Sequence, residues 1–421
     1  MKILVVGGGG REHAIVWKLA QSSRVEKIYC APGNGGTAQI AQNIPAKATD
    51  LEAVRDFALS ESIDLVFVAP DDPLAMGMVD FLENSGIRAF GPRAAAARIE
   101  ASKSYAKDLM KKYNIPTAAY EIFTDMEAAL AYIERCELPV VIKADGLALG
   151  KGVIIAEARE EALKAVKEMM SDGVFGTAGR TIVVEEFLRG PELTVLAFAD
   201  GKTVKAMVSS RDHKRALDGD MGLNTGGMGA IAPGADLTEE QQREMHELIF
   251  QPTIDAMRAE GSPFAGVIYF GLMLTAAGPK VIEYNARFGD PETQVVLPLL
   301  ETDFVDIIDA CIDGKLDQLE INWSDRCACV VVMASGGYPG KYETGKIISG
   351  LESAVKPGDD AIIFHAGTSS DGNVVITSGG RVLGVTALAD SRDKAIDKAY
   401  EIVGRISFDN CHYRRDIGRT C

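Results

Sequence analysis

The chain has 421 residues, of which 47% are hydrophobic and 25% charged, and its formal net charge is −16 at pH 7. This length exceeds one ordinary hydrophobic core and predicts two to four domains. The acidic balance argues against a nucleic-acid or anionic-membrane partner, because phosphates would be repelled. No apolar run approaches the roughly 20 residues that a membrane span needs, and the first residues lack the long apolar stretch of a signal peptide. A cytoplasmic protein is therefore expected.

Seven cysteines are scattered along the chain without a CxxC pair, and the five histidines form no ligand-spaced pair. So few cysteines in so long a chain indicate reduced thiols in a reducing compartment. The sequence therefore favours neither a disulfide framework nor a zinc site.

Residues 1–101 alternate short apolar strands with helical patterns, which predicts an N-terminal α/β domain. The expected strands are Lys2–Val6, Lys27–Ala31 and Asp64–Ala69, and the expected helices are Arg11–Gln21 and Leu51–Leu59. This alternation is typical of a parallel sheet with helices on both faces. Ligands of such sheets bind at the carboxyl ends of the strands, where this chain has a glycine loop, Gly7–Gly10.

The remaining chain divides into a central region, residues 102–320, and a strand-rich C-terminal domain, residues 321–421. Residues 120–200 predict a small α+β lobe whose last two strands are joined at Arg189-Gly190-Pro191. Residues 211–234 carry six glycines without clear periodicity, and a structureless stretch of that length in a compact protein is usually functional. Other expected elements are helices at 94–113, 238–260 and 391–405 and strands at 266–275 and 280–287.

The strongest motif is the segment Val281–Arg287, which predicts a strand followed by a polar turn, Phe288–Glu292. Alternate side chains of a strand share a face, so Glu283, Asn285 and Arg287 are expected to point the same way. A carboxylate and an amide oxygen suit a hard divalent cation such as Mg²⁺. An arginine beside them can hold a carboxylate or phosphate through two hydrogen bonds. The alternative is a solvated strand face.

A second motif joins Lys143, at the end of an apolar strand, to the loop Gly146–Gly152, which contains three glycines and Lys151. A lysine at that position needs an anionic partner or an exit to water, and the backbone N–H groups of a glycine loop can cradle phosphates. The loop is not a P-loop, because only three residues separate its first two glycines and a glycine replaces the Ser or Thr. A flexible hairpin turn is the alternative.

The glycine loop after the first strand does not predict a dinucleotide site. Glu12 replaces the third glycine of that fingerprint, and no acidic residue ends the second strand. The loop still opens a helix, whose free N–H groups can hold a phosphate. We therefore expect a phosphate site at Gly9, Gly10 and Arg11, whereas His13 suits capping or packing at least as well as catalysis.

Two further polar segments are ambiguous by themselves. Glu185 and Glu186, at the end of an apolar strand, could accept hydrogen bonds from adenine or ribose, but alone they are better explained as an acidic hairpin end. The segment Arg211–Arg215, with the glycine loop Gly226–Gly229, could bind a polyanion such as triphosphate or form a solvated loop.

Together these motifs resemble one family, the glycinamide ribonucleotide synthetases of the ATP-grasp superfamily, over essentially the whole chain. The most specific segments are DHKRALDGD at 212–220, NTGGMGA at 224–230 and NARFGDPETQ at 285–294. Others are GGREHA at 9–14, APGNGGTA at 31–38, VIKADGLALGKGV at 141–153, SGGYPG at 335–340, FHAGT at 364–368 and RRDIG at 414–418.

The resemblance implies a biotin-carboxylase-like N-terminal domain, an ATP-grasp domain with a small mobile lobe, and a strand-rich C-terminal domain. It implies that ATP, glycine and 5-phosphoribosylamine give ADP, phosphate and glycinamide ribonucleotide, a step of de novo purine synthesis, through glycyl phosphate. Neither half-reaction needs a protein nucleophile, so catalysis would rest on positioning and charge stabilisation. ATP and Mg²⁺ or Mn²⁺ would be the cofactors, and a monomer is compatible with the sequence.

The resemblance also implies the site residues. ATP would contact Lys103, Lys143, Gly150, Lys151, Gly152, Glu185, Glu186, Phe187 and Glu192. Glu283 and Asn285 would hold the metal, and Arg287 and Lys151 would act in catalysis. The other substrates would contact Gly9, Gly10, Arg11, Asp212, His213, Arg287 and Asp290.

Two departures from the family pattern leave questions open. Phe270–Met273 offers no second metal-binding acid, so the number of metal ions is not set, and the loop Ala69–Leu74 differs from the commoner Gly-Pro-Glu-Ala-Pro-Leu. A purine-pathway carboxylase of the same superfamily is the nearest rival, but the family-specific segments argue against it. A nucleotide sensor with a dead site is disfavoured because the lysines and the Glu283-x-Asn285-x-Arg287 row are all present.

Overall fold

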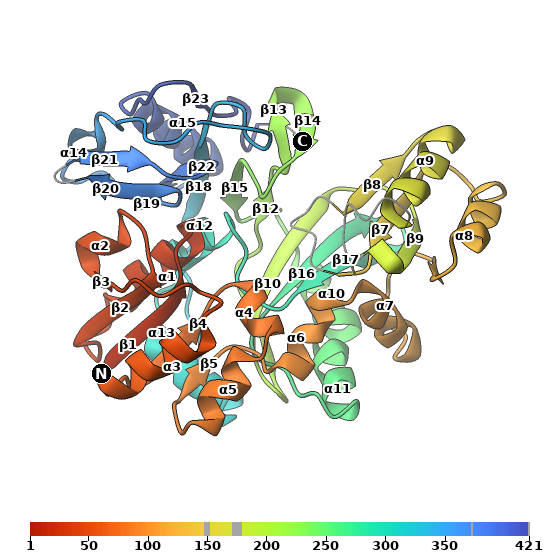
Figure 1. Cartoon of the computed structure of the whole chain (residues 1–421), viewed down its shortest axis with the longest axis horizontal. Helices are drawn as coiled ribbons and strands as arrows, with labels where there is room; N and C mark the ends of the chain where they lie inside the picture. The colour runs from red at the N-terminus through yellow and green to blue at the C-terminus, as the bar shows by residue number, and fades with distance from the viewer. Residues whose placement is uncertain (147–151, 171–178, 372–373, 420–421) are drawn as a thin grey trace.

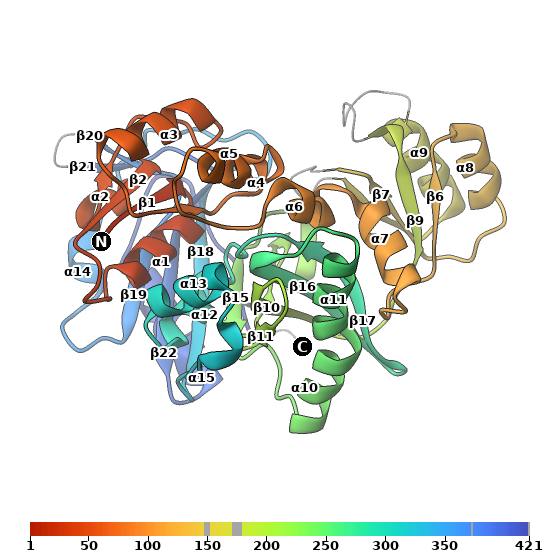
Figure 2. The same cartoon turned by 90° about the horizontal axis from the view of Figure 1, so that it is seen from below.

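The computed structural model describes residues 1–146, 152–170, 179–371 and 374–419. Sheets from the two ends of the chain lie next to each other on one side of the molecule (Figure 1). A small lobe projects from the other side, and Figure 2 shows a central sheet between them. No helix in the described ranges is both long and apolar enough to cross a membrane.

The N-terminal sheet is parallel throughout, with the strand order β3-β2-β1-β4-β5, which confirms the predicted sheet. Its strands are β1 (Lys2–Gly7), β2 (Lys27–Pro32), β3 (Gln42–Asn43), β4 (Leu65–Val68) and β5 (Ala89–Phe90). Its helices are α1 (Gly10–Leu19), α2 (Thr37–Ile40), α3 (Leu51–Ser60), α4 (Asp71–Ala75), α5 (Met78–Asn84) and α6 (Ala94–Ala101). Gly7 pairs with Pro32, so the glycine loop and residues 33–37 leave the same edge of the sheet.

The predicted helix at 94–113 is two helices, α6 and α7 (Lys103–Lys112), divided at Ser102. Ser102 adopts an extended backbone conformation, and its Oγ accepts a hydrogen bond from Tyr105 N at 3.2 Å. Serine favours such an N-cap because its hydroxyl satisfies a free N–H group of the first turn. The new helix therefore begins at Lys103.

The lobe is a four-stranded sheet, β6-β9-β7-β8, with two helices packed on it. Its elements are β6 (Tyr120–Phe123), α8 (Met126–Ile133), β7 (Val140–Ala144), β8 (Val153–Ala156), α9 (Arg159–Met170) and β9 (Ile182–Glu186). Among the described residues, the hydrophobic core of the lobe contains only side chains of the lobe itself, such as Ile133, Ile142 and Val166. The lobe is thus an independently packed unit.

The central sheet has the order β11-β10-β16-β17 and contains β10 (Glu192–Asp200), β11 (Val204–Ala206), β16 (Ala265–Thr275) and β17 (Gly278–Asn285). Assigning β10 to the lobe was wrong, because β10 pairs with β16 and not with β9. Gly190, with φ 150°, redirects the chain at this point, and a Cβ there would overlap the Leu274 carbonyl. A local hydrophobic pattern cannot show which sheet a strand joins.

Helices around the central sheet complete its core. They are α10 (Glu239–Met245), a π-helical turn (His246–Phe250), α11 (Gln251–Ala259) and α13 (Phe304–Asp313), with a 3₁₀ turn at Leu316–Gln318. Helix α12 (Thr293–Val296), followed by a 3₁₀ turn at Leu297–Leu299, lies between α1 and the C-terminal sheet. The helix predicted at 238–260 is therefore continuous apart from the π-helical turn.

The C-terminal sheet has the order β12-β15-β18-β22-β19, and β23 pairs with β18. Its elements are β12 (Arg211–Asp212), β15 (Gly229–Ala232), β18 (Cys327–Ser335), α14 (Leu351–Ala354), β19 (Ala361–His365), β22 (Arg381–Ala389), α15 (Arg392–Val403) and β23 (Cys411–His412). Two hairpins accompany it, β13 (Arg215–Leu217) with β14 (Met221–Asn224), and β20 (Thr368–Asp371) with β21 (Val374–Thr377).

The prediction that residues 211–234 are structureless was wrong, because they form four short strands. β15 pairs with β18, and β12 pairs with β15. Strands of two to four residues separated by glycines carry no readable periodicity, and these form through pairing with distant segments.

His13 and His365 join the N-terminal and C-terminal domains in a buried contact. His365 N donates a hydrogen bond to His13 Nδ1 at 2.8 Å, and the rings of His13 and Phe364 meet edge-on with centroids 5.7 Å apart. Burial lowers the pKa of His13 to about 3, with a further contribution from His365, and burial lowers the pKa of His365 to about 4. Both imidazoles are therefore neutral at pH 7, in a packing role.

The lowered pKa of His365 predicts loss of stability in acid. As the pH falls from 6.5, the ordinary histidine pKa, to about 4, the unfolded chain takes up a proton that folded His365 does not. The free energy of unfolding should fall over that window by up to about 1.4 kcal/mol per pH unit for this group. His365→Gln should lose this part of the slope in chemical denaturation, whereas His246→Gln, at a half-exposed position, should keep it. An unchanged slope in H365Q would contradict the assignment.

Candidate active site

Glu185 lies between two lysines in the buried seam where the lobe meets α7. Lys107 Nζ is 2.9 Å from Glu185 Oε2, and Lys143 Nζ is 3.0 Å from Oε1. All three side chains are almost fully buried. Two ammonium groups thus face one carboxylate, which leaves an excess of positive charge in this seam.

Lys103 adds a third positive group beside the glycine loop. Its Nζ donates a hydrogen bond to the Gly146 carbonyl at 2.8 Å, and burial lowers its pKa. Ala144 N donates to the Gly152 carbonyl at 2.8 Å, so the two ends of the loop are tied together. Gly150 and Lys151 lie outside the described residues.

Glu283 faces the lysines from the central sheet. Lys214 Nζ lies 3.4 Å from Glu283 Oε1 and 3.7 Å from Glu192 Oε2. Lys214 lowers the pKa of Glu283 to about 2, and Lys143 and Lys103 contribute in the same direction against the effect of burial. Glu283 is therefore a carboxylate at neutral pH, surrounded by positive charge that an anionic ligand would share.

Arg287 does not share a strand face with Glu283 and Asn285, because β17 ends at Asn285. Its Nη2 forms an ion pair with Glu100 Oε1 at 3.0 Å and donates to Asn285 Oδ1 at 3.3 Å. Glu100 Oε2 in turn accepts from Ala286 N at 2.7 Å. Arg287 Nε is buried and has no hydrogen-bond partner among the described residues. The guanidinium is thus fixed by Glu100 while one donor stays available.

Acidic side chains gather behind Glu283. Burial raises the pKa of Asp212, and burial together with the neighbouring Asp212 raises the pKa of Glu292 to about 7. Burial alone would lower the pKa of Lys214, but the carboxylates of Glu283 and Asp212 raise it well above its usual value. Lys214 is therefore the positive centre of this acidic group.

The oxygen donors suit a hard cation that is shared with phosphates. The described residues contain no group of three His, Cys, Asp or Glu side chains suited to holding a metal ion. Glu283 and Asn285 supply one carboxylate and one amide oxygen, and the Arg287 contact to Asn285 is long. Mg²⁺ commonly binds through one or two protein oxygens together with nucleotide phosphates. The residues present fit that arrangement.

The acids at the lobe end of the seam differ in their surroundings. Glu186 Oε2 accepts a hydrogen bond from Ala119 N at 3.1 Å and lies 3.8 Å from Lys280 Nζ. The Arg189 guanidinium lies over the Phe187 ring, 5.4 Å from its centroid. Glu186 and Glu192 are exposed, in contrast to Glu185.

A pocket of about 320 Å³ opens between the N-terminal glycine loop and the C-terminal domain. Its lining residues are Gly8, Gly9, Gly33, Asn34, Asp290, Ala366, Gly367, Thr368, Ser378 and Arg381. Arg381 Nη2 pairs with Asp290 Oδ2 at 3.0 Å, and Asn34 Nδ2 donates to the carbonyls of Gly8 at 3.0 Å and His365 at 2.8 Å. The pocket is thus lined by segments near both ends of the chain and by the turn after β17.

Gly10 and Arg11 lie beside this pocket without lining it. A Cβ at Gly10 would sit 2.6 Å from Gln294 Nε2, so this position allows α1 to approach α12. Arg11 is buried, with its Nε 2.6 Å from Glu12 Oε1 and its Nη1 donating to the Phe288 carbonyl at 3.1 Å. Arg11 therefore braces the turn that carries Asp290.

His213 faces the C-terminal segment. Its Nε2 accepts a hydrogen bond from Gly418 N at 3.0 Å, and burial lowers its pKa to about 4. Arg414 is fully buried, and its Nη1 forms an ion pair at 2.7 Å with Oδ1 of Asp220, which lies between β13 and β14. Residues 414–418 thus fix the segment that carries Asp212 and Lys214.

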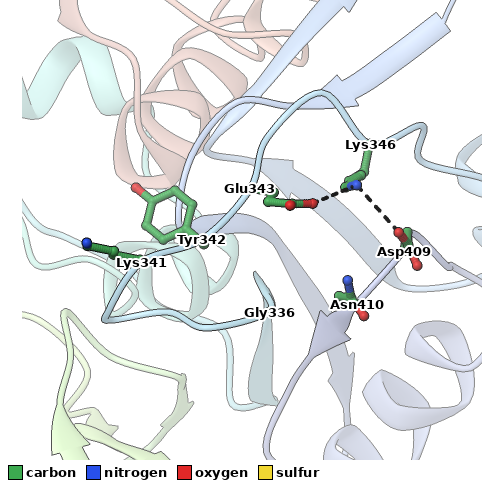
Figure 3. A pocket seen from close by; sticks show the side chains of 7 residues that line it. All are labelled: Gly336, Lys341, Tyr342, Glu343, Lys346, Asp409 and Asn410. Carbon is green, nitrogen blue, oxygen red and sulfur yellow. Dashed lines mark ion pairs between the residues drawn. The ribbon is translucent and has the colours of Figure 1, made fainter.

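A second depression, of about 300 Å³, lies within the C-terminal domain (Figure 3). Its lining residues are Gly336, Lys341, Tyr342, Glu343, Lys346, Asp409 and Asn410. Lys346 pairs with Glu343 at 2.9 Å and with Asp409 at 3.5 Å, so its charge is already matched. None of the predicted site residues lines it, so the seam and the first pocket are the candidate active site.

Family models for phosphoribosylglycinamide synthetase match three consecutive parts of the chain. The N domain matches residues 1–100, the ATP-grasp (A) domain 101–293 and the C domain 328–420. The chain belongs to the phosphoribosylglycinamide synthetase family. The family, the ligase class and the reaction predicted from the sequence are confirmed.

Relatives of the phosphoribosylglycinamide synthetase family match over the full length. Phosphoribosylamine–glycine ligase of Caldanaerobacter subterraneus subsp. tengcongensis is 49% identical over 417 residues, 99% of each chain. The crystal structure of that ligase from Thermotoga maritima has a TM-score of 0.86 at 34% identity and covers 99% of this chain and 100% of its own.

A more distant structure shows the fold alone. The biotin carboxylase domain of 2-oxoglutarate carboxylase from Hydrogenobacter thermophilus, in complex with MgADP, ADP and bicarbonate, has a TM-score of 0.75 at 17% identity. It covers 98% of this chain and 91% of its own. The predicted biotin-carboxylase-like ATP-grasp fold is confirmed.

Sequence reasoning missed several residues that the structure brings to the site. Lys107 follows Lys103 by one helical turn, and that i, i+4 spacing was the available signal. Lys214 stands inside the segment Arg211–Arg215, which was expected to bind a polyanion or to form a solvated loop, and Glu292 stands inside a recognised motif without a role of its own. Asn34, Thr368 and Arg381 are distant in sequence from each other, and only the fold brings them to one pocket.

The geometry of Arg287 predicts a catalytic defect in Arg287→Lys. The lysine keeps the charge opposite Glu100 but loses the planar guanidinium and its free Nε donor. Turnover should fall about a hundred- to a thousandfold, roughly 3–4 kcal/mol, the usual cost of removing one aimed donor. Steady-state kinetics and thermal melting should be measured together, with Arg258→Lys on α11 as an exposed control. A destabilised R287K with near-normal turnover would assign Arg287 to bracing the turn.

Proposed function

We propose that the chain joins glycine to 5-phosphoribosylamine at the seam between lobe and central sheet, in two steps. A glycine carboxylate oxygen attacks the γ-phosphorus of ATP, and ADP leaves, which gives glycyl phosphate. The amine nitrogen of phosphoribosylamine then attacks the acyl carbon, loses a proton and expels phosphate. The observation that carries this proposal is the convergence of Lys103 and Lys143 on Glu283, in a chain that also has a pocket lined by Gly9 and Asp290.

Positive charge in the seam supports binding of the triphosphate. Lys103 and Lys143 would contact the phosphates together with Gly150, Lys151 and Gly152 of the loop. Glu186, Phe187 and Glu192, at the lobe end of the seam, would contact adenine and ribose. Bound Mg²⁺ or Mn²⁺, held by Glu283 and Asn285, would neutralise charge on the phosphates.

The two acceptor substrates would meet near the turn after β17. Arg287, with its free Nε, would hold the glycine carboxylate or the acyl phosphate. Asp212 lies close enough to Glu283 for that carboxylate to contribute to raising the pKa of Asp212. The pocket of about 320 Å³ is within the usual range for a small ligand. Phosphoribosylamine would place its phosphate at the glycine loop, where the N-terminus of α1 supplies N–H donors.

Several wider properties belong to this proposal. The division at residues 101 and 320 would separate substrate-binding, ATP-grasp and C-terminal domains, and closure of the lobe over ATP is favoured by its separate core. A cytoplasmic location and an absence of nucleic-acid partners fit the net charge of −16.

The reaction is tested by ADP release with each substrate omitted in turn. ADP should form at the full rate only when ATP, glycine, a divalent cation and freshly made phosphoribosylamine are all present. Release that requires bicarbonate in place of glycine would support a carboxylase, and nucleotide binding without any ADP release would support a sensor. Either result would refute the proposal.

The ionised state of Glu283 predicts how Glu283→Gln behaves. Removal of this anionic ligand should raise the Mg²⁺ concentration needed for half-maximal activity, while affinity for the nucleotide changes less. Activity titrated against Mg²⁺ measures the first effect, and binding of a non-hydrolysable ATP analogue the second. Glu240→Gln, exposed on α10, serves as control. A Mg²⁺ dependence equal to that of the parent enzyme would show that Glu283 is not a ligand.

The crowding around Gly9 predicts a selective defect in Gly9→Val. A Cβ at this position would lie 2.8 Å from Glu12 Oε2 and 3.4 Å from Asp290 Oδ2, so the larger side chain would enter the pocket. The apparent KM for phosphoribosylamine should rise by roughly tenfold, equivalent to about 1.4 kcal/mol. The KM for ATP, measured on the same preparation, should stay near the parent value. The reverse pattern would assign the loop to the nucleotide.

A further inference from the structure

We propose that Lys107 is a positioning residue that neutralises Glu185, so that Lys143 is left free to bind the phosphates of ATP. This inference rests on the proposed function of Lys143. It gives Glu185 the role of a shared counter-ion and replaces the adenine or ribose contact that the family resemblance implied for it.

The first support is the enclosure of the three charges. Lys107, Lys143 and Glu185 are 2%, 4% and 3% exposed, so none of them can exchange its partner for water. Lys107 Nζ lies 2.9 Å from Glu185 Oε2, and Lys143 Nζ lies 3.0 Å from Oε1 and 3.1 Å from Oε2. Glu185 is therefore held from both sides.

The second support is that β17 fixes both lysines. Lys107 Nζ donates to Thr117 Oγ1 at 2.7 Å, and Thr117 Oγ1 donates to the Val281 carbonyl at 2.7 Å. Lys143 Nζ donates to the next carbonyl of that strand, Ile282, at 3.0 Å. Because Glu283 follows directly, this network sets the lysines relative to the proposed metal ligand.

The third support is the cost of separating a buried ion pair. If Lys107 were absent, Lys143 would be the sole counter-ion of Glu185, and its movement toward ATP would leave a buried carboxylate unpaired. With Lys107 in place, Lys143 can turn toward the phosphates while Glu185 stays paired. Burial lowers the pKa of Lys107 to about 8, although Glu185 acts in the opposite direction. The lowered pKa is the effect expected for an ammonium group removed from water.

Helix α7 supplies a matched control. It lies beside β9, which carries Glu185 (Figure 2). Lys107 and Lys111 are one turn apart, and each places its Nζ 5.7 Å from the centroid of the Tyr120 ring. Lys111 is exposed and has no ion pair with Glu185. Lys111→Met therefore removes a similar charge from the same helix without changing the buried seam.

The test is a double-mutant cycle with Lys107→Met, Glu185→Gln and both together. Affinity for a non-hydrolysable ATP analogue, measured by calorimetry, should fall on the order of tenfold in K107M, because Lys143 then stays with Glu185. The double variant has no carboxylate to hold Lys143 and should recover to within about threefold of the parent. Lys111→Met should bind like the parent.

Specific outcomes would overturn the inference. A double variant that binds the analogue as weakly as K107M, or more weakly, would show that Lys107 does not act through Glu185. A K107M that melts earlier but binds normally would show a purely structural role. If K107M does not fold, the double variant decides alone, with parent-like affinity in support and weak binding against. Binding of the analogue needs no acceptor substrate, so failure of the proposed ligase reaction is a separate result.

Discussion

Charge balance in a buried seam constrains the whole active site. Lys107, Lys143 and Lys103 come from α7 and the lobe, whereas Glu283 comes from the central sheet. Buried charges are tolerated only when they are paired and hydrogen-bonded, so each element must be in place for the others to be stable. The excess of positive charge then has one natural partner, a polyanion. Under the proposed function, affinity for ATP and the packing of the lobe against the central sheet would be two effects of one arrangement.

The pocket at the glycine loop depends on a different principle, the close approach of backbone segments from both ends of the chain. Asn34 ties the glycine loop to the His365 carbonyl, and Arg381 ties the C-terminal sheet to Asp290. Glycines at the loop leave room for a ligand that side chains would otherwise fill. The turn after β17 belongs to both sites, since Arg287 and Asp290 stand three residues apart. This turn is where the activated and accepting groups would meet.

Much of the fold could be predicted because its N-terminal strands are apolar, short and separated by helices of clear period. The family followed from long motifs such as NARFGDPETQ. The predictions that were wrong concerned strands whose position depends on pairing between distant segments. β10 has the pattern of a lobe strand but joins β16, and β12–β15 are too short to show a period.

At the site, Lys143 was predicted because a charge at the end of an apolar strand needs a partner, and Glu283 was predicted because it alternates with Asn285 in a strand and supplies an oxygen ligand for a hard cation. It could not show that Glu185 turns toward two lysines, since that orientation is set by α7. It placed Arg287 on the strand face, because the end of β17 at Asn285 is determined by Glu100 and the following turn. An alternating sequence pattern therefore cannot predict a role that depends on which neighbouring residue a side chain contacts.

The contact of residues 414–418 with the hairpin at 215–224 bears on how the enzyme is made. His213 and Asp220 contact residues about two hundred positions later in the chain, Gly418 and Arg414 respectively. The segment with Asp212 and Lys214 pairs with β15 earlier in the chain, but its contacts with residues 414–418 can form only after residue 418 has been synthesised. These contacts are therefore among the last that a growing chain can make.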